Sequence, residues 1–160
     1  MSINWYPGHM VRAKREIEAN LKLVDIVAII LDARAPFSCR NRELENMVGN
    51  KPVLMVLNKS DLADPGLTRR YLEDIRAEGF SALSMDSLHR KGKKALLQAL
   101  TAAYQPKARE MLAKGRRVRP ARVMVAGVPN TGKSTFLNCL VGRNTAATGA
   151  RPGITRGKQW

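Results

Sequence analysis

A glycine-containing segment at residues 127–134 has the residue types and spacing of a phosphate-binding loop. It reads Gly-Val-Pro-Asn-Thr-Gly-Lys-Ser and matches the pattern G-x-x-x-x-G-K-[ST], with an apolar run before it and a helical pattern after it. In such a loop, backbone N–H groups converge on phosphate oxygens and the helix N-terminus adds a favourable dipole. We expect Lys133 to reach the β- and γ-phosphates and Ser134 to bind Mg²⁺. The other loop residues predicted to bind nucleotide are Asn130, Thr131, Gly132 and Thr135. The alternative is that the match is a chance glycine-rich turn.

A second segment, Asn58-Lys59-Ser60-Asp61, has the form Asn-Lys-x-Asp and is predicted to bind the base. The Asp61 carboxylate can accept two hydrogen bonds from the N1–H and exocyclic amino group of guanine, and adenine lacks both donors in this arrangement. Asn58 is expected to brace the loop and to meet the other edge of the base, while the Lys59 stem lies along the purine ring. A base without these donors leaves a buried charge unsatisfied, so the segment predicts selectivity for guanine. Alternatively, Asp61 caps the next helix or lies in solvent.

Hydrophobic periodicity predicts the elements that must position these two segments. Helices are predicted over residues 10–24, from 38 or 41 to 48, and over 67–78, 91–104 and 133–140, and strands over 25–31, 52–57, 80–85 and 123–126. Strands that alternate with helices pair in parallel through right-handed crossovers, which predicts an α/β fold, a three-layer sandwich with a mostly parallel sheet. Both segments then follow strands at the edge where open parallel sheets bind ligands.

The composition is strongly basic, with 28 Lys and Arg against 13 Asp and Glu and a formal net charge of +15 over 160 residues. Such an excess favours a polyanionic partner, although a solvated surface would also carry it. Part of the charge lies in residues 105–119, where Pro106 interrupts the helical pattern. This stretch is predicted to be a basic connector between the two halves of the chain, either a contact for nucleic acid or a solvated hinge.

The two cysteines and the longest apolar run indicate the cellular compartment of the protein. Cys39 and Cys139 lack metal-ligand spacing and are expected to be reduced thiols, which indicates a cytoplasmic protein. The apolar run at residues 26–31 is too short to span a bilayer, and the N-terminus lacks the layout of a signal peptide. No membrane partner is expected.

The order of the two segments is reversed relative to most TRAFAC-class GTPases, in which the phosphate-binding loop comes first. In this respect the sequence resembles the circularly permuted GTPases. Three further stretches are similar to the ribosome-biogenesis GTPase A family: Trp5-Tyr6-Pro7-Gly8-His9-Met10, Asp32-Ala33-Arg34 and Arg151-Pro-Gly-Ile-Thr155. The resemblance implies a circularly permuted P-loop GTPase fold. Residues 1–104 would form the base-recognition half, 105–121 the basic connector and 122–160 the phosphate-binding loop and first switch.

The resemblance also implies roles for residues outside the two segments. Asp86 and Ser87 would form the second base-contacting loop, with backbone amides facing the guanine carbonyl, or else a plain turn. Thr155 would supply a second hydroxyl to Mg²⁺ from a switch loop that nucleotide hydrolysis releases, or would lie in a surface loop. Asn130 would help to bind K⁺.

Hydrolysis of GTP needs an oriented water, and the resemblance assigns this role to His9. The alternative is that His9 only anchors the first helix turn. The motif Asp-x-x-Gly, which senses the γ-phosphate in such proteins, is not found in this sequence. We therefore expect the chain to be part of a longer protein, with the C-terminal part of the domain outside it, and expect binding more firmly than hydrolysis.

Together these features predict a monomeric GTPase that assembles the large ribosomal subunit, with GTP or GDP controlling its affinity for ribosomal RNA. Phosphate contacts from the basic connector would weaken with salt. One alternative is an RNA-binding scaffold that holds GTP or GDP without turnover. Another is a P-loop enzyme of nucleotide metabolism, which would need an acceptor pocket that the sequence does not indicate.

Overall fold

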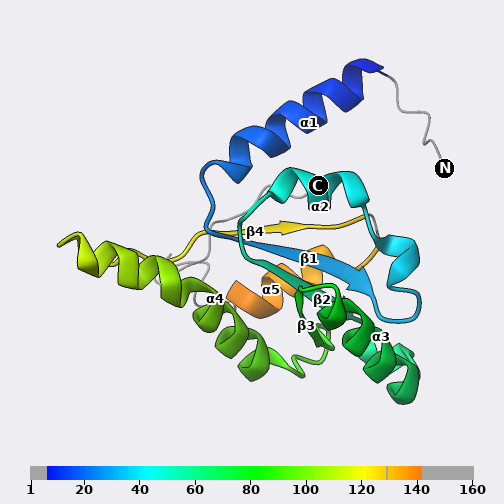
Figure 1. Ribbon diagram of the computed structural model, residues 1–160. Coiled ribbons are helices and arrows are strands. Elements are labelled where there is room, and N and C mark those ends of the chain that lie inside the picture. Colours follow the sequence, from blue (N-terminus) through cyan, green and yellow to red (C-terminus); the bar gives the residue numbers. More distant parts are fainter. Residues whose placement is uncertain (1–6, 129, 142–160) are drawn as a thin grey trace.

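Four parallel strands form a single sheet in the computed structural model, which describes residues 7–128 and 130–141, with the backbone alone for residues 7–13. The strands are β1 (Ile26–Asp32), β2 (Val53–Asn58), β3 (Ser81–Ser84) and β4 (Val123–Ala126). Their order across the sheet is β3-β2-β1-β4, and every neighbouring pair is parallel. The predicted α/β fold with a parallel sheet is confirmed (Figure 1).

Within residues 7–128 and 130–141, five α-helices and two short 3-10 helices lie before, between and after the strands. They are α1 (Pro7–Leu21), η1 (Phe37–Cys39), α2 (Arg42–Val48), η2 (Ser60–Leu62), α3 (Pro65–Ala77), α4 (Lys93–Ala113) and α5 (Lys133–Val141). The Asn41 side chain caps α2 by accepting a hydrogen bond from the Leu44 amide at 3.1 Å, which selects the later of the two predicted starts. In the described residues, no helix combines the length and the apolar character that crossing a bilayer requires.

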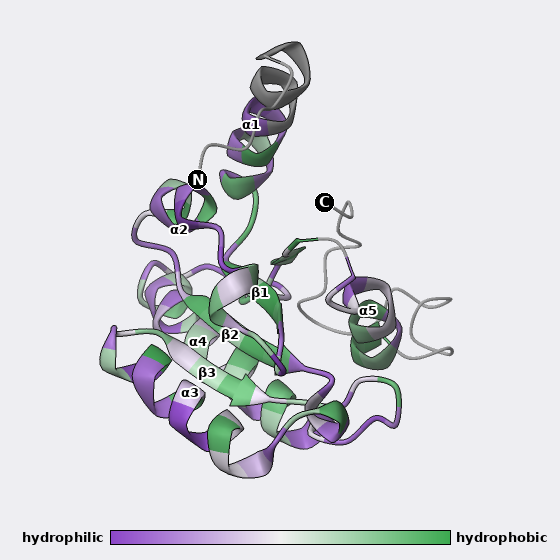
Figure 2. Ribbon diagram, turned by 90° about the vertical axis from the view of Figure 1, so that its right-hand side faces the viewer, coloured by the Kyte–Doolittle hydropathy of each residue, from purple (hydrophilic) through white to green (hydrophobic). Residues whose placement is uncertain are grey.

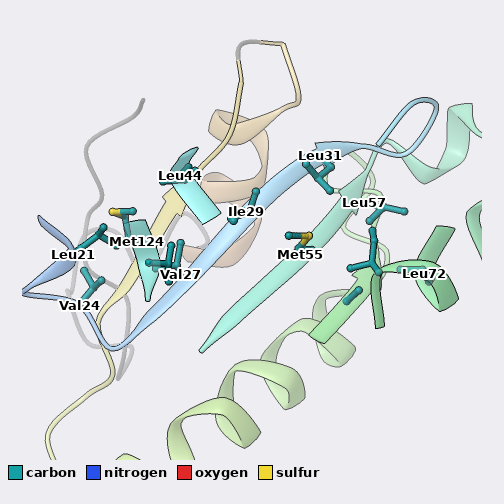
Figure 3. Close-up of a cluster of buried hydrophobic side chains, with 14 of the residues drawn as sticks. Leu21, Val24, Val27, Ile29, Leu31, Leu44, Met55, Leu57, Leu72 and Met124 are labelled. Carbon is teal, nitrogen blue, oxygen red and sulfur yellow. The ribbon is translucent and has the colours of Figure 1, made fainter. Parts of the chain in front are cut away.

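Side chains that alternate along each strand form two hydrophobic cores, one on each face of the sheet. On β1, Val27, Ile29 and Leu31 belong to the first core, which includes residues of α1, α2 and α3 (Figure 3). The intervening side chains Ile26, Ala28 and Ile30 belong to the second core, with residues of α4 and α5. Figure 2 shows mostly hydrophobic colouring along the strands and alternating hydrophilic and hydrophobic colouring along the helices. The three-layer sandwich is therefore confirmed.

The helix before β4 is longer than the sequence predicts. α4 was expected to end at Tyr104, but it continues through Pro106 to Ala113. Proline removes one helical N–H bond, whose acceptor would be the Ala102 carbonyl. Ala102 lies on an exposed turn, where water can replace the lost donor, so the helix tolerates the proline. The first turns of the predicted connector are thus helical.

Candidate nucleotide-binding site

The ends of three neighbouring strands bring the two predicted segments together at one edge of the sheet. β1 and β2 pair with Asp32 opposite Asn58, the first residue of the base-reading segment (residues 58–61). β4 lies on the other side of β1 and ends at Ala126, directly before the phosphate-binding loop (residues 127–134). Two segments that are far apart in the chain therefore become neighbours.

The buried side chain of Asn58 joins three parts of the site. Its Nδ2 donates to the Thr131 carbonyl of the phosphate-binding loop at 3.0 Å. Its Oδ1 accepts from the Ser87 amide at 3.1 Å and from the Ser87 hydroxyl at 2.7 Å. Asn58 and Ser87 are only 2% and 3% exposed, so breaking this network would leave polar groups unsatisfied. The bracing that the sequence predicts for Asn58 is present, and its contact with a base remains a prediction.

Lys59 makes a second bridge to the phosphate-binding loop. Its Nζ donates to the Asn130 carbonyl at 2.6 Å and lies 4.0 Å from Asp32 Oδ2. The backbone of Lys59 is left-handed, with φ of 60°, which turns the chain sharply at the end of β2. The Lys59 stem therefore crosses from the base-reading segment to the loop.

Asp32 is held ionised beside Lys59. Arg34 hydrogen-bonds its carboxylate through the backbone amide at 3.0 Å and through the guanidinium at 3.0 and 2.7 Å. These hydrogen bonds, with the charge of Lys59, keep the pKa of Asp32 below its ordinary value despite partial burial. The Asp32 carboxylate therefore attracts the side chain of Lys59 and helps to hold its position.

Two glycines of the phosphate-binding loop are required by close backbone and side-chain approach. A Cβ on Gly132 would lie 2.4 Å from Asn58 Nδ2, and one on Gly127 would lie 2.5 Å from the Ile30 carbonyl oxygen. Gly132 also has a φ of +88°, which L side chains rarely adopt. The glycines therefore allow the loop to lie against β1 and the base-reading segment.

The lysine of the loop lies over the loop itself. Lys133 Nζ donates to the Gly127 carbonyl at 2.8 Å, and burial lowers the pKa of Lys133. Thr131 is buried and donates from its hydroxyl to the Val128 carbonyl at 3.0 Å. Ser134 is exposed and Thr135 half-buried in the first turn of α5. Because a partly buried ammonium at a helix N-terminus favours an anion, the arrangement suits phosphate.

The loop after β3 differs in detail from its prediction. The Asp86 amide donates to the Lys91 carbonyl at 3.0 Å, and the Ser87 amide donates to Asn58. The two amides predicted to face the guanine carbonyl therefore have partners within the protein. In the described residues, the next amide, that of Leu88, has no such bond, and the Leu88 side chain is 73% exposed.

Asp86 is buried and fixes a histidine that the sequence prediction missed. Its carboxylate accepts from the His89 amide at 3.1 Å and lies 2.7 Å from His89 Nδ1. Burial alone would raise the pKa of Asp86, but the hydrogen bonds from His89 lower it overall. A partial signal was available, because Asp side chains in turns commonly hydrogen-bond backbone amides shortly after them in the chain.

Asp61 lies beside this histidine and is about a third exposed, with its Oδ2 3.9 Å from His89 Nδ1. It does not cap the next helix, because the cap of α3 is Asp64, which accepts from the Leu67 amide at 2.9 Å. That alternative for Asp61 is therefore wrong. Ser60 follows Lys59 and is half-buried, with its amide donating to the Met85 carbonyl at 3.1 Å.

Two predicted site residues cannot be placed in this geometry. Thr155 lies outside the described residues, and for His9 only the backbone, within α1, is described. The switch and catalytic roles given to them remain predictions.

Sequence comparisons identify related proteins. A family model described as 50S ribosome-binding GTPase matches residues 122–160. The chain is 41% identical over 160 residues to ribosome biogenesis GTPase A of Bacillus cereus. The match covers 100% of this chain and 54% of that protein. The chain thus spans about half the length of the curated relatives that it matches.

Solved structures show the same similarity. GNP-bound YlqF from T. maritima has a TM-score of 0.62 and 29% sequence identity, covering 93% of this chain and 59% of that chain. GDP-bound YlqF has a TM-score of 0.61 and 32% identity, covering 80% of this chain and 48% of that chain.

Proposed function

Since the chain has a circularly permuted P-loop GTPase fold and is similar over its whole length to ribosome biogenesis GTPase A, we propose that it binds and hydrolyses GTP in ribosome assembly. The observation that carries this proposal is the buried Asn58, which joins the base-reading segment to the phosphate-binding loop. A site whose base-binding and phosphate-binding parts are bonded to each other suits one nucleotide that spans both.

Guanine is recognised by Asp61, whose carboxylate accepts from N1–H and the exocyclic amino group. The Lys59 stem lies along the purine face, in the direction set by its bond to Asn130. The guanine carbonyl accepts from the Leu88 amide, because the amides of Asp86 and Ser87 are already engaged. This proposal moves the contact one residue along from the sequence prediction.

The phosphates lie over the loop amides and the N-terminus of α5, where Lys133 exchanges its bond to Gly127 for the β- and γ-phosphates. The Ser134 and Thr155 hydroxyls are oxygen donors, the ligand type that Mg²⁺ prefers, and Ser134 is exposed at the correct helix turn. Mg²⁺, when bound, neutralises charge on the transferring phosphoryl group. Asn130 contributes to a K⁺ site in the same loop.

Hydrolysis requires a water in line with the γ-phosphate, and we assign its orientation to His9. A neutral imidazole can accept a proton from that water or donate to developing charge near neutral pH. Thr155 lies in the switch whose order depends on the γ-phosphate, which couples hydrolysis to a change in the surface.

The partner of the protein is the large ribosomal subunit. The bound nucleotide sets the affinity of this monomeric, cytoplasmic protein for ribosomal RNA. The net charge of +15 supports a polyanionic partner. Phosphate release from GTP is expected to accelerate when large subunits are added. A chain that binds GTP yet releases no phosphate with subunits present would be a scaffold, and the hydrolytic part of the proposal would be wrong.

Replacement of the guanine-reading carboxylate tests base recognition directly. In Asp61→Asn the amide can donate to the 2-oxo group of xanthine but cannot accept both guanine donors. We expect the affinity for GDP to fall by about 100-fold and the affinity for XDP to rise, because the charged acceptor of two hydrogen bonds to guanine is lost. Fluorescence titration with labelled nucleotides measures both.

The control is Asp64→Asn, which changes a nearby carboxylate that caps α3. This variant should keep its helix cap, because Asn caps helices about as well as Asp, and should keep its preference for GDP. Equal losses of GDP affinity in the two variants, or no change in Asp61→Asn, would contradict the assignment.

A further inference from the structure

We propose that the C-terminal part of α4 and the turn after it, residues 105–118, form a preorganised arm that binds the phosphate backbone of RNA. The proposal rests on the proposed ribosomal function for the identity of the RNA. It concerns a surface remote from the nucleotide-binding edge, because this part of α4 leads back to the start of β4 and not to its end.

The arm lies beyond the body of the protein. The first half of α4 buries Leu96 and Leu100 in the second core. After Tyr104, only Ala108 and Met111 of the arm are half-buried, and all other arm residues are exposed. Figure 1 shows this yellow-green end of α4 extending past the sheet. Burial in the core therefore does not explain why this part of the helix persists.

Specific contacts hold the arm in place at its base. The Tyr104 hydroxyl donates to the Arg119 carbonyl at 2.7 Å, which ties the helix to the returning chain. The Arg119 guanidinium donates to both oxygens of the Asp25 carboxylate, at 2.8 and 2.9 Å, and the Arg122 amide donates to the same group at 2.8 Å. Asp25 directly precedes β1, so these contacts join the base of the arm to the sheet.

The tip of the arm also has a defined turn. Gly115 ends the helix with a left-handed φ of 68°, and its amide donates to the Leu112 carbonyl at 3.0 Å. The Arg116 amide donates to the Met111 carbonyl at 2.8 Å. An arm with fixed backbone loses less conformational entropy when it binds than a flexible linker would.

The charge on the arm is mostly unneutralised. It contains Lys107, Arg109, Lys114, Arg116 and Arg117 against a single acidic residue, Glu110. Glu110 pairs with Lys114 at 2.7 Å. Across the described part of the chain, the other four cations form no salt bridge. Four exposed charges close together repel one another, and a polyanion relieves this repulsion.

RNA is the polyanion that these side chains fit best. Three of the four unpaired cations are arginines, whose planar guanidinium can bind phosphate through two parallel hydrogen bonds. A membrane-surface helix would need a continuous apolar face. On the arm, the large apolar side chains that are exposed are the separate residues Leu112 and Val118, at 64% and 39%. The observations therefore favour nucleic acid over an anionic bilayer.

The test removes the four unpaired charges together. The variant Lys107→Gln, Arg109→Gln, Arg116→Gln, Arg117→Gln is compared with a control that loses four exposed charges elsewhere: Arg15→Gln, Lys22→Gln, Arg69→Gln, Arg70→Gln. Binding to a short RNA duplex and to purified large ribosomal subunits is measured by fluorescence anisotropy across a range of salt concentrations. The affinity for GDP is measured on the same samples.

For the arm variant we expect RNA affinity to fall at least about tenfold at moderate salt. The slope of log K against log salt should decrease in magnitude by about 3 to 4, since each neutralised phosphate contributes about 0.9. GDP affinity should stay unchanged, and the control should keep most of its RNA affinity. The expected pattern separates a localised contact from the effect of net charge.

Equal losses in the arm variant and the control would overturn the proposal, as would unchanged RNA binding in the arm variant. Loss of binding to polyglutamate or to phosphatidylserine vesicles, with RNA binding retained, would assign the arm to a different partner and would also overturn it. If the arm binds the RNA duplex but the protein shows no preference for large subunits, the arm stands and the ribosomal function is wrong. If subunit binding depends on nucleotide and the arm variant binds RNA and subunits normally, the ribosomal function stands and the arm proposal is wrong.

Discussion

At the residue scale, the candidate site depends on a few side chains that bond across long distances in the sequence. Asn58 and Thr131 are 73 positions apart, and Lys59 and Asn130 are 71 apart, yet each pair is hydrogen-bonded. These bonds join the end of β2 to the phosphate-binding loop. Any atom inserted between the two segments should separate the base-binding part from the phosphate-binding part.

Gly132→Ala inserts such an atom. Its Cβ would lie 2.4 Å from Asn58 Nδ2, at a backbone φ of +88°. We expect GDP affinity to fall more than about tenfold, because either the loop or Asn58 must shift and a buried hydrogen bond of about 1–3 kcal/mol is lost. Isothermal titration with GDP measures the loss.

Gly49→Ala is the matched control, because Gly49 also has a left-handed φ, of +63°, but nothing lies within 4 Å of the added Cβ. This variant should lose about 1 kcal/mol of stability and bind GDP normally. If both variants bind GDP equally well, the close approach of the two segments does not govern the site.

At the element scale, a link between the start of β1 and the chain after α4 fixes where the second half of the chain enters the sheet. Asp25 is the junction, because Arg119 and Arg122 both donate to its carboxylate. Its side chain is 6% exposed, so loss of its partners would leave a charge poorly solvated. Burial would raise the pKa of Asp25, but the hydrogen bonds from Arg119 and Arg122 lower it overall.

Asp25→Asn is expected to reduce the free energy of unfolding by about 2 kcal/mol at pH 7, which lowers the melting temperature by about 4–8 °C. Because the folded pKa of Asp25 lies below the ordinary value of 3.8, its contribution is complete above that value. The contribution disappears as the pH falls through the lower folded pKa. Melting curves of both proteins should therefore converge in acid.

Glu110→Gln serves as the comparison for this junction. Glu110 forms an exposed pair with Lys114, so its replacement should leave the melting temperature almost unchanged at pH 7. A difference between Asp25→Asn and the parent protein that stays constant from pH 7 into acid would show that the carboxylate charge is not responsible.

At the scale of the whole molecule, a nucleotide bound at this site would contact both transposed parts of the chain. In the proposed binding mode, the base would lie at the end of β2 and the phosphates after β4, with β1 between these strands. A ligand that binds only the folded arrangement stabilises it by mass action. Nucleotide should therefore act as a clamp on the entire sheet.

GDP at about 100 times its Kd should stabilise the fold by about 2.7 kcal/mol. For a chain of this size the melting temperature should then rise by about 5–10 °C. ADP at the same concentration is the control, because its base lacks the donors proposed to bond to Asp61, and it should give a much smaller shift. Equal shifts with the two nucleotides would indicate a phosphate site without base recognition.

Local sequence patterns were sufficient to predict much of the fold and of the candidate site. The strands, the helices and the two motifs follow from hydrophobic periodicity, capping residues and glycine spacing, all of which act over a few neighbouring residues. The N-cap at Asn41 and the parallel sheet are examples that the structure confirms. The order of the motifs, also visible in the sequence alone, indicated the permuted fold.

Two features depend on residues that are remote in the sequence, and they follow from the tertiary structure. α4 continues past Pro106 with its end tied to the chain at Arg119 and, through it, to Asp25. The amide of Ser87 is taken by Asn58, which redirects the proposed guanine contact to Leu88. Hydrogen bonds of this kind depend on which strand ends become neighbours, and no local pattern encodes that. The sequence determined the chemistry available to this protein, and the packing of the sheet determined which atoms are left to carry it out.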